Sequence, residues 1–162
     1  METIKKILNN KWLSLIIRII AGCIFIFFSL DKISEPLKFA QDITRYQLLP
    51  QLFINVLAVI IPWIELIVGI FLIAGIRLRA TATLYNILML VFTSAVISAI
   101  ARGLSIDDCG CSAHTTPADW WKVLENSIML LLGIYIMLFP VNKFSIENLA
   151  IKDYINTNVA KS

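Results

Sequence analysis

Long apolar stretches separated by short polar segments dominate the chain. Four of them, at residues 13–30, 52–76, 80–101 and 121–139, approach the roughly 20 residues that an α-helix needs to cross a ~30 Å hydrocarbon layer. In lipid, every backbone N–H and C=O must find its partner inside the protein, which favours helices. The pattern therefore predicts an all-α protein, a bundle of four transmembrane helices.

The segment between Pro36 and Pro50 has a different pattern. Its apolar residues Phe39, Ile43 and Tyr46 recur at helical spacing, with charged and amide side chains between them. We predict a short amphipathic helix after the first span, on the extracytoplasmic side of the membrane. It either lies in the membrane interface or caps the bundle, and the cap is the simpler interpretation.

The composition agrees with lipid as the solvent. Of the 162 residues, 59% are hydrophobic and 15% charged, and the mean hydropathy is +0.82. Soluble domains are roughly 45–50% apolar and about 25% charged. The net charge of +3 is small and spread along the chain, which argues against nucleic acid as a partner. No linker, repeat or low-complexity run divides the chain, so residues 1–162 are predicted to form a single integral membrane domain.

The distribution of Lys and Arg predicts the orientation, because these residues favour the cytoplasmic side. One side of the predicted bundle carries nine of the 14, namely Lys5, Lys6, Lys11, Arg18, Arg77, Arg79, Lys143, Lys152 and Lys161. The other carries Lys32, Lys38, Arg45, Arg102 and Lys122. We therefore expect both termini, including the tail 140–162, in the cytoplasm of a bacterium, and the 102–119 loop in the periplasm.

That loop contains Cys109-Gly110-Cys111, the most informative feature of the sequence. A disulfide between two cysteines this close is strained and therefore exchangeable, which suits passing oxidising equivalents to another protein's thiols. An inert structural bridge is the alternative, although so small a loop would stabilise the fold only weakly. A third possibility is a thiophilic metal held by Cys109, Cys111 and His114, since thiolates and imidazole suit Cu(I) or Zn(II). The third cysteine, Cys23, lies inside the first span, where a free thiol behaves as a small hydrophobe.

Arg18 and Glu65 are charged residues inside predicted spans. Each costs ~2.5–3.5 kcal/mol near a helix centre, so such residues pair with each other or line a site. We expect an Arg18–Glu65 ion pair that locks the first two spans, with a proton path or a quinone headgroup site as the functional alternative. Pro62, Glu65 and Gly69 share one helical face, which is predicted to point into the bundle.

Three further charged residues lie near the cysteine loop in the predicted topology: Lys32, Asp108 and Glu125. A lysine beside a thiol favours the thiolate, which is the reactive form. Lys32 is therefore a candidate to activate Cys109 or Cys111, and snorkelling of its side chain to the membrane interface is the equally plausible alternative.

The order of these residues resembles a known family, the MauE branch of the DoxX-like membrane proteins. The resemblance covers roughly residues 14–139 and depends on the order of Arg18, Gly22, Phe28, Lys32, Pro36, Tyr46, Pro50, Pro62, Glu65, Gly69, Gly75, Arg79 and Arg102-Gly103 before Asp108-Cys109-Gly110-Cys111. Family members often continue the cysteine motif with Phe-Gly and open the fourth span with Arg-Asn. Here Ser112-Ala113 and Glu125-Asn126 stand at those places.

The resemblance implies four transmembrane helices and a role in periplasmic redox maturation. From the cysteine loop and this resemblance together, we expect a protein that supports disulfide formation with a thioredoxin-like protein or a redox enzyme subunit as partner. We also expect it to pass electrons from that partner or a sulfur compound to quinone. Two alternatives remain open: a non-catalytic membrane subunit that anchors or matures a redox complex, and a loop that binds a thiophilic metal or sulfur species.

Overall fold

The computed structural model describes residues 11–104 and 119–140 of the chain. These residues form five helices: α2 (Lys11–Ser34), α3 (Pro36–Arg45), α4 (Gln51–Ala74), α5 (Leu78–Ala101) and α6 (Trp120–Leu138). The four long helices are each long and apolar enough to cross a membrane. The predicted all-α bundle of four spans is confirmed.

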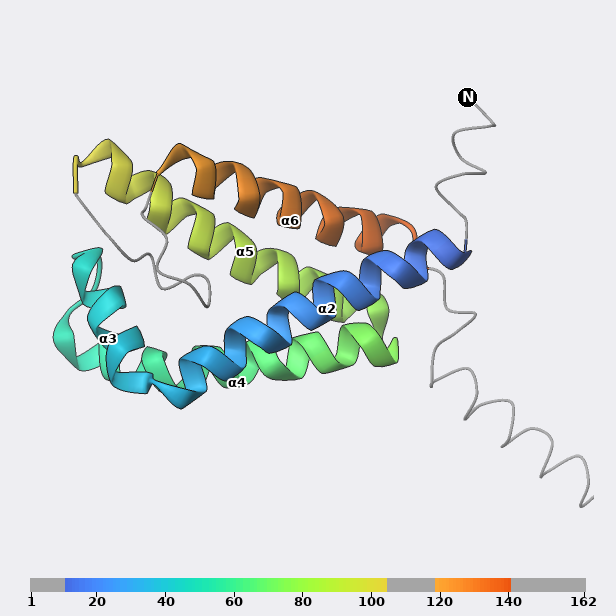
Figure 1. Cartoon of the computed structure of the whole chain (residues 1–162), viewed down its shortest axis with the longest axis horizontal. Helices are drawn as coiled ribbons and strands as arrows, with labels where there is room; N and C mark the ends of the chain where they lie inside the picture. Colours follow the sequence, from blue (N-terminus) through green and yellow to red (C-terminus); the bar gives the residue numbers. More distant parts are fainter. Residues whose placement is uncertain (1–10, 105–118, 141–162) are drawn as a thin grey trace, which may run out of the picture.

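The long helices form two pairs, α2 with α4 and α5 with α6, and the contact between α4 and α5 is less extensive (Figure 1). A short turn joins α4 to α5 at one end of the bundle, which we call the hairpin end. The opposite end carries α3, the C-terminus of α5 and the N-terminus of α6 (Figure 1). We call it the loop end, because residues 104 and 119, which flank the cysteine segment, both lie there.

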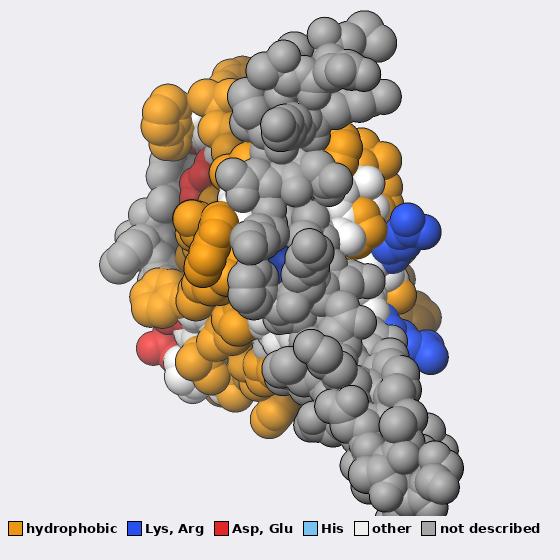
Figure 2. All heavy atoms as spheres, turned by 90° about the vertical axis from the view of Figure 1, so that its right-hand side faces the viewer, with side chains coloured by type: hydrophobic (Ala, Val, Ile, Leu, Met, Phe, Trp, Pro, Cys, Tyr) orange, Lys and Arg blue, Asp and Glu red, His pale blue; other side chains and the backbone are white. Residues whose placement is uncertain are grey.

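The outer surface of the bundle is strongly apolar. Each long helix exposes large hydrophobic side chains, and Phe27, Val59, Leu90 and Leu131, one from each helix, are more than half exposed. In the view from the hairpin end, hydrophobic side chains make up most of the surface that is not grey, with a few charged side chains toward its edges (Figure 2). Such a surface is stable in contact with lipid and not with water, so the chain is an integral membrane protein.

The helix ends follow from local signals, and they correct several predicted boundaries. The first span continues beyond the predicted end at residue 30 as far as Ser34, and Pro36 then occupies the first turn of α3, where its missing N–H is tolerated. The second span ends at Ala74 and not at 76, because Gly75 adopts a left-handed conformation (φ 75°) and its N–H bonds to Phe71 O. The fourth span begins at Trp120, where Asp119 caps the helix by accepting from Lys122 N–H.

Two glycines fix the register of α2 against α4. A Cβ atom placed on Gly22 would lie 2.8 Å from Gly69 O, and a Cβ on Gly69 would lie 2.9 Å from Gly22 O. The two backbones therefore approach each other at a distance that only glycine allows, as is common between membrane helices. The buried face of α4 includes Pro62, Glu65 and Gly69, which confirms the predicted inward face.

The short helix α3 caps the loop end and packs mainly against α4. Phe39 and Tyr46 are buried, as the helical spacing of the apolar residues suggested, which supports the cap over a helix lying free in the interface. Asp42 departs from that pattern, since it is also buried although the spacing put it among the polar positions. Arg45 Nη1 lies 3.5 Å from Asp42 Oδ1, so this carboxylate keeps a charged neighbour at the surface.

Candidate functional site at the loop end

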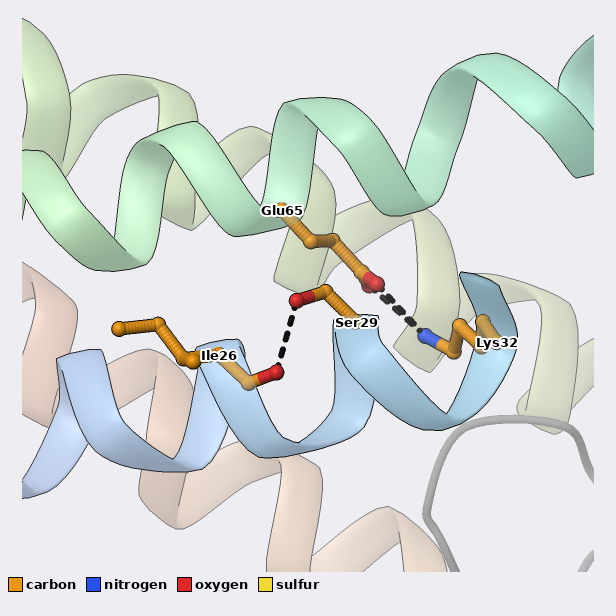
Figure 3. Close-up of polar contacts among 4 residues, drawn as sticks. All are labelled: Ile26, Ser29, Lys32 and Glu65. Carbon is orange, nitrogen blue, oxygen red and sulfur yellow. Dashed lines mark hydrogen bonds and ion pairs between the residues drawn. The ribbon is translucent and has the colours of Figure 1, made fainter. Parts of the chain in front are cut away.

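The polar centre of the bundle is an ion pair between α2 and α4. Lys32 Nζ lies 2.8 Å from Glu65 Oε1 and 2.9 Å from Oε2, and both side chains are at most 4% exposed (Figure 3). Lys32 belongs to the last turn of α2 and Glu65 to the middle of α4. The carboxylate thus compensates the buried ammonium with two hydrogen bonds, and neither charge is left alone in the membrane-spanning region.

Aromatic rings complete the environment of Lys32. The ammonium lies 5.1 Å from the centre of the Phe39 ring and 4.7 Å from the centre of the Phe92 ring, so α3 and α5 both contribute to holding the cation. Ser29, one turn earlier in α2, is fully buried and donates to Ile26 O, 2.8 Å away (Figure 3). Four helices therefore meet at this lysine.

A second buried lysine lies in the first turn of α6, also at the loop end. Lys122 is 2% exposed, and its Nζ donates to Glu125 Oε2 at 2.8 Å and lies 5.9 Å from the centre of the Phe28 ring. Asn126, one turn further along α6, is 5% exposed, and its Nδ2 has no hydrogen-bond partner among the described residues. The loop end thus combines two ammonium groups with a buried amide donor that bonds to no described residue.

The predicted Arg18–Glu65 pair is wrong. Arg18 is buried, but its Nε donates to Leu72 O at 3.0 Å and its Nη2 to Ile73 O at 3.1 Å. These carbonyls belong to the last turn of α4, where C=O groups have no partner within the helix. Arg18 is therefore a C-terminal cap for α4, and its charge compensates the negative end of the helix dipole.

The helix register explains why Glu65 pairs with Lys32. Gly22 lies opposite Gly69, so Arg18 lies level with the C-terminal turn of α4, eight residues or about 12 Å of helix rise from Glu65. In addition, side chains in a helix lean toward its N-terminus. In antiparallel helices, Arg18 and Glu65 therefore lean apart, whereas Glu65 leans toward the end of α2 that carries Lys32.

The structure describes three of the remaining predicted residues, namely Glu125, Lys32 and Cys23. Glu125 lies at the loop end, but it pairs with Lys122 of its own helix. Lys32 does not snorkel to the interface, since it is buried against Glu65. Asp108, Cys109, Cys111 and His114 lie outside the described residues, so their predicted roles stay predictions. Cys23 is exposed on the outer face of α2.

Sequence reasoning missed Lys122 and Phe92 as residues of this site. Lys122 was counted only toward the orientation of the chain, although its three-residue spacing to Glu125 is typical of an ion pair on one helix. Asn126 shares the same face four residues after Lys122. Phe92 had no signal of its own, because nothing distinguishes it from the other apolar residues of the third span.

An apolar pocket of about 190 Å³ lies beside the ion pair, between the two helix pairs. Its lining comes from α3, the turn after it, α4 and α5, and consists of Phe39, Ile43, Tyr46, Leu48, Leu49, Leu57, Ile61, Val91, Phe92 and Ala95. Val91 is more than half exposed and Leu48 nearly so, so the pocket opens on the lateral, lipid-facing surface of the bundle. Phe39 and Phe92 border both this pocket and Lys32.

Four membrane-spanning helices, with an ion pair buried between two of them near the loop end, define a small integral membrane protein. The chain matches the family described as methylamine utilisation protein MauE over residues 10–139, so it belongs to the MauE family. It is 28% identical over 122 residues to the methylamine utilization protein MauE of Paracoccus denitrificans. That alignment covers 74% of this chain and 66% of the relative, just under two thirds of its length. No solved structure matches the chain.

Proposed function

We propose that this chain is a membrane thiol–disulfide redox protein that supports disulfide formation in, or maturation of, a periplasmic redox partner. Membership of the MauE family supports a place in the membrane-bound part of such a system, of the kind that serves methylamine utilisation. In this proposal the loop end faces the periplasm, and Cys109 and Cys111 carry the chemistry.

The observation that carries the proposal is the position of Lys32. The segment that contains both cysteines is attached at both of its ends, residues 104 and 119, to the end of the bundle where Lys32 and Lys122 are buried. A cation near a thiol stabilises the thiolate. Glu65 fixes the Lys32 ammonium with two hydrogen bonds, so it acts as a positioning residue for that cation.

The proposed reaction has two balanced halves. A thiolate of a thioredoxin-like partner attacks one sulfur of the Cys109–Cys111 disulfide and forms a mixed disulfide, and the partner's second thiol then releases the reduced pair. The partner is oxidised by two electrons and the cysteine pair is reduced by two. The reduced pair then gives two electrons and two protons to a membrane quinone, which leaves as quinol while the disulfide re-forms.

Thiol trapping in intact cells tests the first half. A membrane-impermeant maleimide is applied with and without prior reduction to the wild type and to the Cys109→Ser, Cys111→Ser and Cys23→Ser variants. We expect labelling of Cys109 and Cys111 only after reduction, and one of the two loop variants should accumulate a mixed disulfide with the partner. Cys23→Ser is the matched control and should behave like the wild type, because Cys23 lies on the outer face of α2.

Two outcomes would contradict the proposal. Labelling of both loop thiols without reduction would mean that they hold no disulfide at steady state, as in the metal-binding alternative. A stoichiometric partner that co-purifies with both single variants, with no mixed disulfide and no turnover, would favour a non-catalytic anchoring subunit.

A further inference from the structure

We propose that the lateral pocket between α3, α4 and α5 binds the ring of a membrane quinone and is the port through which this acceptor reaches the loop end. The inference rests on the proposed function, because it names the place where the electron acceptor of that reaction would bind. Its basis is the position, shape and lining of the pocket.

The position of the pocket selects a ligand that comes from the bilayer. Its opening lies on the lipid-facing side of the bundle, where Val91 is more than half exposed, and every residue that lines it is apolar or aromatic. A water-soluble molecule would have to cross lipid to enter and would find no lining side chain of a charged or amide type. The occupant must therefore be a lipophilic molecule.

The size and lining of the pocket favour a flat ring over a flexible chain. A cavity of about 150 Å³ is enough to admit a single six-membered aromatic ring, and this pocket measures about 190 Å³. Its inner wall includes the rings of Phe39 and Phe92, which offer surfaces for stacking or edge-to-face contact. The open mouth allows an isoprenoid tail to remain in the lipid.

The neighbourhood of the pocket favours a ring that carries oxygen atoms. The Lys32 ammonium lies 5.1 Å and 4.7 Å from the centres of the Phe39 and Phe92 rings, so a buried cation is immediately behind two residues of the pocket wall. A quinone carbonyl that becomes negatively charged on reduction is stabilised by such a cation. An acyl chain of a phospholipid has no group that would benefit from it.

Direct binding tests the proposal without any thiol chemistry. The full-length Cys109→Ser/Cys111→Ser protein is placed in nanodiscs of fixed phospholipid composition and titrated with a short-tailed azido-benzoquinone, with the photolabelled residues mapped by mass spectrometry. We expect labels on residues 39–49 and 91–95. Ala95→Phe, which fills the pocket, should weaken binding by about tenfold or more, because the ring can no longer enter.

Two further variants keep the test decisive. Ile97→Phe adds the same ring to the same helix at an exposed position that does not line the pocket, and it should leave the affinity within about twofold of its parent. Leu57→Phe narrows the pocket from α4 and should weaken binding even if Ala95→Phe fails to fold. Equal labelling in the Ala95→Phe and Ile97→Phe proteins, or labelling that rises with the probe concentration without saturating, would overturn the proposal.

The two proposals fail in distinguishable ways. If Cys109 and Cys111 are found reduced in cells while the protein in nanodiscs binds quinone normally, the thiol mechanism is contradicted and the pocket assignment stays intact. Normal thiol exchange with a partner and no saturable quinone binding would overturn the pocket assignment alone.

Discussion

Breaking the Lys32–Glu65 pair is the most informative perturbation, because stability and function respond to it differently. Glu65→Gln removes the charge that compensates Lys32, which is 4% exposed and otherwise contacts the faces of two phenyl rings. Removing one partner of a buried ion pair costs about 3–5 kcal/mol, because the remaining charge stays buried without compensation. For a protein of this size that corresponds to a decrease in Tm of roughly 6–20 °C.

The double variant Lys32→Met/Glu65→Leu is the matched control. Both charges are then replaced by apolar groups of similar volume, which is often neutral or stabilising by about 1–4 kcal/mol. We therefore expect the double variant to melt at or above the Tm of the wild type, while Lys32→Met alone, which leaves Glu65 unpaired, melts well below it. The Tm is measured in detergent by size-exclusion chromatography of heated samples. With Glu65→Leu as the second single variant, the wild type, Lys32→Met, Glu65→Leu and the double variant form a double-mutant cycle.

The same double variant separates packing from chemistry. If Lys32 activates the loop thiols, maleimide should alkylate Cys109 and Cys111 more slowly in the reduced double variant than in the reduced wild type. The reason is that less of the reactive thiolate is present at a given pH. A Tm for Glu65→Gln within about 2 °C of the wild type, with additive effects in the cycle, would refute the ion-pair argument. Unchanged thiol reactivity in the stable double variant would refute the functional role of Lys32.

Two further substitutions test the contacts that align α2 with α4. Arg18→Met removes both hydrogen bonds to the C-terminal turn of α4, and leaving those carbonyls unpaired should lower stability by about 1–3 kcal/mol, whereas the exposed Arg79→Met should change it little. Gly69→Ala places a Cβ 2.9 Å from Gly22 O and should lower the stability by about 1–3 kcal/mol, seen as a lower Tm in the same assay. Its control is Ile70→Ala on the lipid-facing side of α4, which should change the Tm little. A Tm for Arg18→Met or Gly69→Ala equal to that of its control would contradict the register described here.

The fold could be predicted from the sequence because lipid imposes a simple requirement. A span must be apolar over about 20 residues and must satisfy its own backbone, so four such stretches predict four helices. Helix ends depend on single residues that the hydropathy pattern does not resolve. The chain leaves α4 at Gly75, whose left-handed conformation stops the helix two residues before the apolar run ends.

The pairing of the buried charges could not be predicted in the same way. Arg18 and Glu65 were matched because both lie within apolar stretches, and Lys32 was excluded because it follows the first of them. The actual pairing depends on the register set by Gly22 and Gly69 and on the direction in which helix side chains lean. Hydropathy contains neither quantity. The short α3 helix also could not be taken into account by hydropathy. It covers the end of α2 and buries Lys32, which the sequence places at the edge of the membrane.

One geometric feature accounts for both the buried ion pair and the pocket. The short turn after Gly75 holds α4 and α5 together at the hairpin end (Figure 1). Toward the loop end the pocket lies between these two helices, and α3 also contributes to its lining. Phe39 of α3 and Phe92 of α5 close over Lys32 from the two sides of that gap. A movement of α3 away from α5 would therefore widen the pocket and expose the ammonium at the same time, so binding in the pocket and the exposure of Lys32 are expected to be coupled through this one short helix.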